Sequence, residues 1–135
     1  MSDELPNDDK NRMAKEFFLR ATKAQQSRNW EYAVEMWKNA TKMVPDNQQF
    51  RIGLRMSQRQ VYGDNGKGAK MAGMKLRGIR GKAKKAGAKE NWKEMDHIAE
   101  DGLCLNPWDG QLLHDAGEAC EQRGVNEIAR VQYKW

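Results

Sequence analysis

Two similar stretches place the strongest constraint on the fold of this chain. Residues 29–47 read NWEYAVEMWKNATKMVPDN, and residues 91–109 read NWKEMDHIAEDGLCLNPWD. Both open with Asn-Trp and close with Pro and a short polar turn. Because an Asn side chain caps the first turn of a helix and Pro ends one, each copy is expected to form a single helix.

Apolar residues in each copy recur at the spacing of one helical face. They are Trp30, Ala33, Val34, Trp37 and Ala40 in the first copy, and Trp92, Met95, Ala99 and Gly102 in the second. A duplicated amphipathic helix indicates stacked repeats, in which each unit buries its apolar face against its neighbours. The Trp side chains of these stripes are therefore predicted to pack in the core, and not to stack on a ligand.

The small and aromatic residues around these helices resemble the tetratricopeptide repeat family, whose unit is two antiparallel helices in about 34 residues. The matching positions are Phe17, Ala21, Ala24, Ala33, Trp37, Ala40 and Pro45, then Ile79, Ala83, Ala86, Met95, Ala99, Gly102 and Pro107, then Ala116, Gly117, Cys120, Ala129 and Tyr133. The resemblance implies an all-α fold of about seven helices, a short right-handed α-solenoid of helix-turn-helix repeats.

The same register predicts how the chain is divided. Residues 1–7 are expected to be a disordered acidic tail, and residues 8–135 one helical domain with repeats at 14–47 and 76–109. Residues 48–75 form a shortened, irregular repeat, because the two Asn-Trp pairs are 62 residues apart and not two full units. Residues 110–135 form an incomplete repeat whose last helix begins near residue 126. Because a solenoid normally ends in a polar capping helix, the chain is expected to belong to a longer array.

Local signals refine two of these helices. Asp46 and Gln49 form a capping-box pattern at the start of the third helix. The fourth helix carries Ala72, Leu76, Ile79, Ala83 and Ala86 on one seam. Small residues on this helix are expected to let a neighbouring helix approach closely. Gly73, Gly78 and Gly81 are expected to weaken the helix, at about 1 kcal/mol each relative to Ala.

Charge is distributed unevenly along the chain. The net charge is +5, but residues 63–89 hold nine Lys or Arg and one Asp, whereas residues 90–135 hold four Lys or Arg and ten Asp or Glu. A basic segment followed by an acidic one favours an anion-binding surface. The alternative interpretation is a solvated helix face docked against the acidic segment.

The resemblance also implies a concave groove, lined by the first helix of each pair, that binds an extended peptide or a partner helix. The implied groove residues are Phe18, Thr22, Ile52, Met56, Arg59, Arg77, Arg80, Lys84 and His114, with Glu118 beside them. Because Phe18 and Thr22 stand where family members carry a Lys/Asn carboxylate clamp, no such clamp is predicted. The expected partner is an acidic, partly apolar protein segment, bound by Arg side chains through bidentate contacts to carboxylates.

Other functions have weaker support. The sequence GDNGKGAK at 63–70 lacks the spacing and the Ser/Thr of a phosphate-binding loop. Neither His97 nor His114 has a Cys or His partner at ligand spacing, and no catalytic set is apparent, so no enzyme activity, cofactor or metal is expected. The alternative function is phosphate-backbone binding of nucleic acid through residues 67–89, although no aromatic residue lies between 63 and 91 to stack on bases.

The remaining expectations concern the environment of the chain. No apolar run approaches the roughly 20 residues of a membrane-spanning helix. Cys104 and Cys120 are sixteen residues apart, which is no metal or redox motif, so buried free thiols in a reducing, cytoplasmic compartment are predicted. Self-association through the C-terminal edge stays open as a further expectation.

Overall fold

The computed structural model describes residues 7–124, 128–129 and 132. Six α-helices follow one another in this part of the chain, without a strand, which confirms the predicted all-α class. They are α1 (Asn7–Gln26), α2 (Trp30–Met43), α3 (Gln48–Val61), α4 (Gly73–Ala88), α5 (Trp92–Leu103) and α6 (Gly110–Gln122). Residue 7 is the first residue of α1, and residues 1–6 of the predicted tail lie outside the described part. Most of the predicted seventh helix also lies outside it.

The chain divides into two compact units, Met1–Ser57 and Gln58–Trp135, and the division falls within α3. The repeat boundaries expected from the sequence remain predictions.

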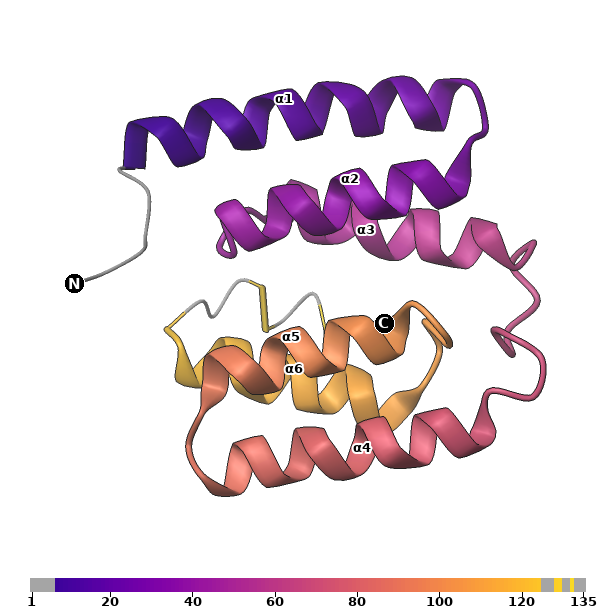
Figure 1. The fold of residues 1–135 in the computed structure, drawn as a ribbon, viewed down its shortest axis with the longest axis vertical. Helices are drawn as coiled ribbons and strands as arrows, with labels where there is room; N and C mark the ends of the chain where they lie inside the picture. The colour runs from indigo at the N-terminus through magenta and orange to yellow at the C-terminus, as the bar shows by residue number, and fades with distance from the viewer. Residues whose placement is uncertain (1–6, 125–127, 130–131, 133–135) are drawn as a thin grey trace. The chain divides into compact units, whose positions relative to one another are not determined.

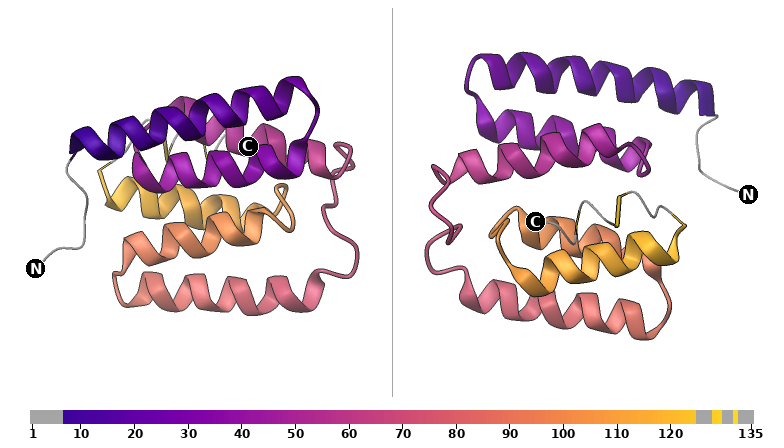
Figure 2. Two further views of the ribbon diagram at one scale, coloured as in Figure 1. Left: turned by 45° about the horizontal axis from the view of Figure 1, so that its top comes forward. Right: turned by 180° about the vertical axis from the view of Figure 1, so that it is seen from behind.

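In the first unit, α1 and α2 form an antiparallel pair joined by a short turn (Figures 1 and 2). Its core centres on Trp37, whose side chain is almost fully buried, as the sequence predicts. The Trp37 ring lies 5.6 Å from Phe18 and 6.1 Å from Phe50, measured between centroids. Gly53 of α3 faces the same indole, and a Cβ atom there would lie only 2.5 Å from it. The absence of a side chain at Gly53 therefore makes room for Trp37.

Asn side chains start three of the helices. As predicted, Asn29 and Asn91 cap α2 and α5, accepting hydrogen bonds from the backbone N–H groups of Tyr32 and Glu94. The prediction for α3 is wrong: the capping residue is Asn47, and not Asp46. The Asn47 Oδ1 atom accepts from the Phe50 N–H at 3.0 Å.

Replacing Asn47 by Ala is expected to reduce the free energy of unfolding by about 1 kcal/mol, because the first turn of α3 loses its cap. Replacing the exposed Asp46 by Ala is the matched control, with an expected change within about 0.5 kcal/mol. Urea unfolding followed by circular dichroism measures both. Equal losses for the two variants would contradict the assignment of the cap.

In the second unit, α5 runs antiparallel to both α4 and α6 (Figures 1 and 2). The buried core residues are Ala72, Leu76, Ala83, Ala99, Leu103, Leu112, Leu113 and Ala116, with Ile79 partly buried against them. This confirms the predicted apolar seam of α4. Gly102 of α5 faces Leu112 and Ile79, and a Cβ there would lie 2.5 Å and 2.8 Å from them, so α5 needs a Gly at this position.

The small residues of α4 differ in their packing: Ala83 and Ala86 are buried, whereas three of the glycines face open space. A Cβ atom built on Gly73, Gly78 or Gly81 would meet no other atom within 4 Å. These three glycines therefore lie on the open side of α4. Among the described residues, glycines that face a neighbouring helix closely include Gly53, Gly102 and Gly87, where a Cβ atom would lie 3.0 Å from the Met95 side chain.

Two further sequence predictions concern the thiols and the membrane. Cys104 and Cys120 are both free, as predicted, although only Cys120 is buried and Cys104 is half-buried. Within the described residues, every helix is too short or too polar to cross a lipid bilayer.

Candidate interaction surface

Four of the predicted groove residues lie in the first unit. Phe18 packs on the rings of Trp37 and Phe50, so it contributes to the core. The Thr22 hydroxyl donates to the Phe18 carbonyl oxygen at 2.8 Å, within α1. Ile52 is half-buried and Met56 is exposed. Phe18 also borders a pocket of about 220 Å³ together with Ala14, Lys15, Val44 and Phe50.

Two of the predicted groove arginines in the second unit are held by other side chains. The Arg59 guanidinium lies over the Trp108 ring, 5.4 Å from its centroid. Both Nε and Nη2 of Arg80 donate to Oδ2 of Asp109, and the Nε distance is 3.0 Å. This hydrogen bond, together with the Asp109 charge, raises the pKa of Arg80 above its usual value despite the opposing effect of burial.

Asp109 explains why Arg80 is held. It is the N-cap of α6, where its Oδ1 accepts from the Leu112 N–H at 3.0 Å. Its side chain is almost fully buried, and Arg80 is its counterion. Through this contact with Asp109, Arg80 connects α4 to the start of α6.

Lys84 and His114 both lie beside Asp115 of α6. The distances to Asp115 Oδ1 are 3.9 Å from Lys84 Nζ and 4.0 Å from His114 Nδ1. The Asp115 side chain is fully buried, and burial raises the pKa of its carboxyl above the usual value, an effect that the Lys84 and His114 charges partly offset. Glu118 follows one helical turn after His114. The sequence analysis missed this cluster, although the His-x3-Glu spacing could have indicated it.

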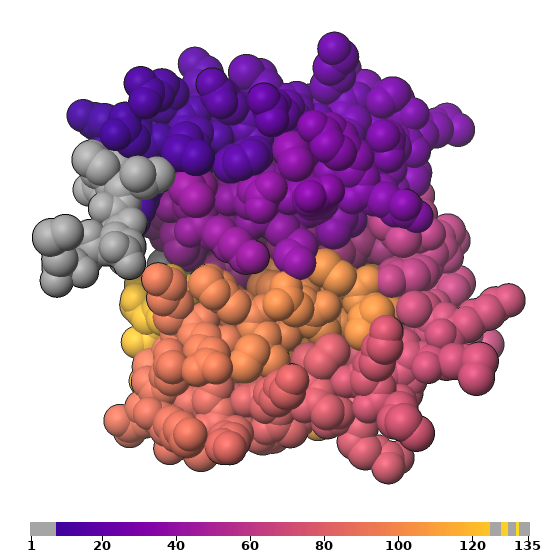
Figure 3. All heavy atoms as spheres, viewed as in Figure 1, coloured from indigo at the N-terminus to yellow at the C-terminus, as the bar shows by residue number. Residues whose placement is uncertain are grey.

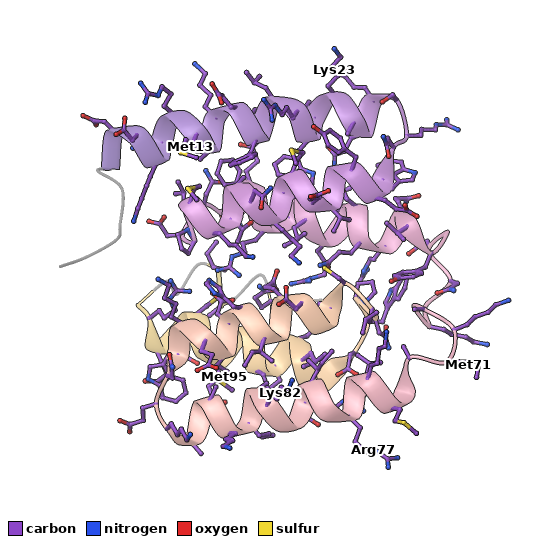
Figure 4. The ribbon with its side chains drawn as sticks, in the orientation of Figure 1. Met13, Lys23, Met71, Arg77, Lys82 and Met95 are labelled. Carbon is purple, nitrogen blue, oxygen red and sulfur yellow. The ribbon has the colours of Figure 1, made fainter. Side chains whose placement is uncertain are left out.

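The other cations of α4 are not bound in this way. Arg77 points away from the body of the second unit (Figure 4) and is exposed. Another face of α4, continued by its C-cap residue, carries four exposed lysines at spacings of seven, three and four residues. We call them the lysine row: Lys75, Lys82 and Lys85 of α4, and Lys89 at the C-cap. Within the described part of the chain, neither Arg77 nor the lysine row makes an ion pair.

Three of the four lysines in the lysine row border a pocket between α4 and α5, and Lys75 does not. The pocket measures about 260 Å³, and its lining residues are Lys82, Lys85, Ala86, Lys89, Glu94 and Ile98. On the face shown in Figure 3, the atoms of α4 and α5 adjoin one another. Glu94, the one acidic residue of the lining, accepts a hydrogen bond from Asn91 Nδ2 at 2.7 Å. The sequence analysis recognised the basic segment, but it did not select the lysine row, whose heptad-like spacing was the available signal.

Two exposed methionines lie at the N-terminal end of α4. Met71 and Met74 are 99% and 87% exposed, and Met71 extends away from the chain (Figure 4). Because these two apolar side chains are exposed, they provide hydrophobic surface near the cations of α4.

The loop at 63–70 has a structural role. Asn65 Oδ1 accepts from the backbone N–H groups of Lys67 and Gly68, at 2.8 Å and 2.9 Å. The Ala69 N–H donates to the Leu105 carbonyl at 2.8 Å, and a Cβ on Gly68 would lie 2.4 Å from that same oxygen. The backbone N–H groups of the loop thus form hydrogen bonds within the loop, and one of them connects the loop to the turn between α5 and α6.

No protein-family model matches the chain, and a search of curated proteins finds no match. The similarity to tetratricopeptide repeats therefore rests on the residues of this sequence.

Proposed function

We propose that this chain is a non-catalytic protein-interaction module, a short solenoid of tetratricopeptide type that binds an acidic, partly apolar segment of a partner protein. The observation that carries the proposal is the lysine row beside the pocket between α4 and α5. The antiparallel order of α4, α5 and α6, in which α6 also contacts α4, supports stacked two-helix repeats. The free thiols support a reducing, cytoplasmic environment.

The dimensions and charge of the lysine row fit such a segment. From Lys75 to Lys89 the helix rises about 21 Å, the length of roughly six extended residues. Ala86 and Ile98 provide an apolar floor beside Lys82 and Lys85. Because the lysines of the row are exposed and make no ion pair within the described chain, an acidic ligand has no existing contact to displace.

The test is the affinity of a synthetic peptide that alternates Glu and Leu, measured by fluorescence anisotropy. Replacing Lys82, Lys85 and Lys89 together by Ala is expected to weaken binding by about tenfold to a hundredfold, at roughly 0.5–1 kcal/mol for each lysine. The matched control removes three exposed lysines elsewhere, Lys15, Lys23 and Lys42, and should change the affinity less than about threefold.

Two outcomes would overturn the proposal. Equal losses in the two triple variants would mean that net charge, and not the lysine row, governs binding. A single-stranded DNA oligonucleotide that binds more tightly than the peptide, with an affinity that falls steeply between about 50 and 200 mM salt, would assign the surface to phosphate backbones.

A further inference from the structure

We propose that His114, Asp115 and Glu118 of α6 form a binding site for a divalent transition-metal ion of the zinc class. Among the residues that the structure describes, these three place one imidazole nitrogen and two carboxylate oxygens within 4.8 Å of one another. His114 and Glu118 are four residues apart and therefore share one helical face. Asp115 lies between that face and α4.

The environment of Asp115 is the second and independent observation. Its side chain is 0% exposed, and neither carboxylate oxygen accepts a hydrogen bond of normal geometry within the described chain, although the Gln111 side chain lies near enough to lower the pKa of the carboxyl. A buried carboxylate without such contacts is unfavourable unless a cation compensates it. The nearest cation, Lys84 Nζ, is 3.9 Å away, longer than the roughly 2.8 Å of a charge-assisted hydrogen bond. Asp115 therefore still has oxygen atoms available to a metal ion.

The donor set indicates which metal would bind. An imidazole nitrogen favours zinc, copper or nickel over magnesium and calcium, which prefer sites built from oxygen alone. The two carboxylates balance the charge of a divalent ion. Three protein ligands leave the fourth tetrahedral position of zinc to water or to a partner's side chain. Zinc–ligand bonds are about 2.0–2.2 Å long, so the three ligand atoms must move closer together to bind the ion. The His114 side chain can make this movement because it is exposed.

Lys84 opposes metal binding in this arrangement. Its ammonium group carries a positive charge beside Asp115, and its side chain is 64% exposed on a flexible stem. A metal ion bound to Asp115 repels this group toward solvent. Removing the Lys84 charge should therefore strengthen metal binding, whereas a general loss of structure would weaken it.

The experiment is isothermal titration of Zn²⁺ into the tag-free, chelator-treated full chain. We expect one equivalent to bind and excess Mg²⁺ not to compete. His114→Gln, Asp115→Asn and Glu118→Gln should each weaken binding by tenfold or more, and Lys84→Gln should strengthen it several-fold. His97→Gln and Cys104→Ser are controls for the other imidazole and for a thiol ligand, and both should bind as the wild type does.

Thermal melting separates ligand loss from misfolding. Metal-free Asp115→Asn should melt at a higher temperature than the metal-free wild type, because a buried carboxylate is replaced by a neutral group of the same shape, and Zn²⁺ should no longer raise its melting temperature. A dissociation constant weaker than about 100 µM for the wild type would overturn the proposal. Binding that survives all three ligand substitutions, or that is lost in Cys104→Ser, would also overturn it.

Discussion

Replacing Trp37 by Ala is expected to lower the free energy of unfolding of the first unit by about 3–5 kcal/mol. Trp37 is 3% exposed and contacts the rings of Phe18 and Phe50. Gly53 has no side chain that can move into the space left behind. The loss in stability therefore has two contributions: the lost burial of a large apolar side chain, and the cost of a cavity that its neighbours do not fill.

Urea unfolding followed by circular dichroism measures this loss, and Trp30→Ala is the matched control. Trp30 opens α2 and is half-buried, so its removal should cost less than half as much. Trp37→Phe should fall between the wild type and Trp37→Ala, because a smaller ring still fills part of the space. Equal effects of the two Trp→Ala variants would refute the central place of Trp37 in the core.

The second large effect is expected at the contact between α4 and α6. Arg80→Ala should destabilise the second unit by about 2–3 kcal/mol, because it leaves the buried Asp109 carboxylate without its counterion. Removing one partner of a buried ion pair usually costs about 3–5 kcal/mol. The loss expected here is at the low end of that range or below it, because Arg80 is partly exposed and Asp109 still accepts the hydrogen bond from the Leu112 N–H. Arg77→Ala, on the same helix and exposed, should change stability by less than about 0.5 kcal/mol.

Chemical denaturation of the two Arg→Ala variants side by side tests this difference. Equal losses of stability in the two variants would mean that the Arg80–Asp109 contact does not stabilise the fold. If the difference is found, a substitution of Arg77, Arg80 and Lys84 together would mix a folding defect with any loss of binding. For this reason the binding test uses the lysine row.

The sequence predicted much of the local structure because helix formation depends on neighbouring residues. The caps at Asn29 and Asn91, the helix ends before Pro45 and Pro107, and the buried seam of α4 follow from side-chain chemistry and a period of 3.6 residues. The capping-box error at Asp46 has the same origin: Asn47, the next residue, is an equally good cap, and only the backbone geometry at the start of α3 selects it.

The tertiary structure decided which side chains meet. Helical periodicity assigns each residue to a face, but it does not say which residue of another helix lies opposite. Arg80 pairs with Asp109, which is 29 residues away, and Asp115 is buried beside Lys84. The same packing leaves Gly73, Gly78 and Gly81 of α4 open and brings a neighbouring side chain close to Gly53 and Gly102. Composition placed a basic segment in this chain, and the packing of α4 on α5 and α6 determined which of its cations pair with buried carboxylates and which remain exposed.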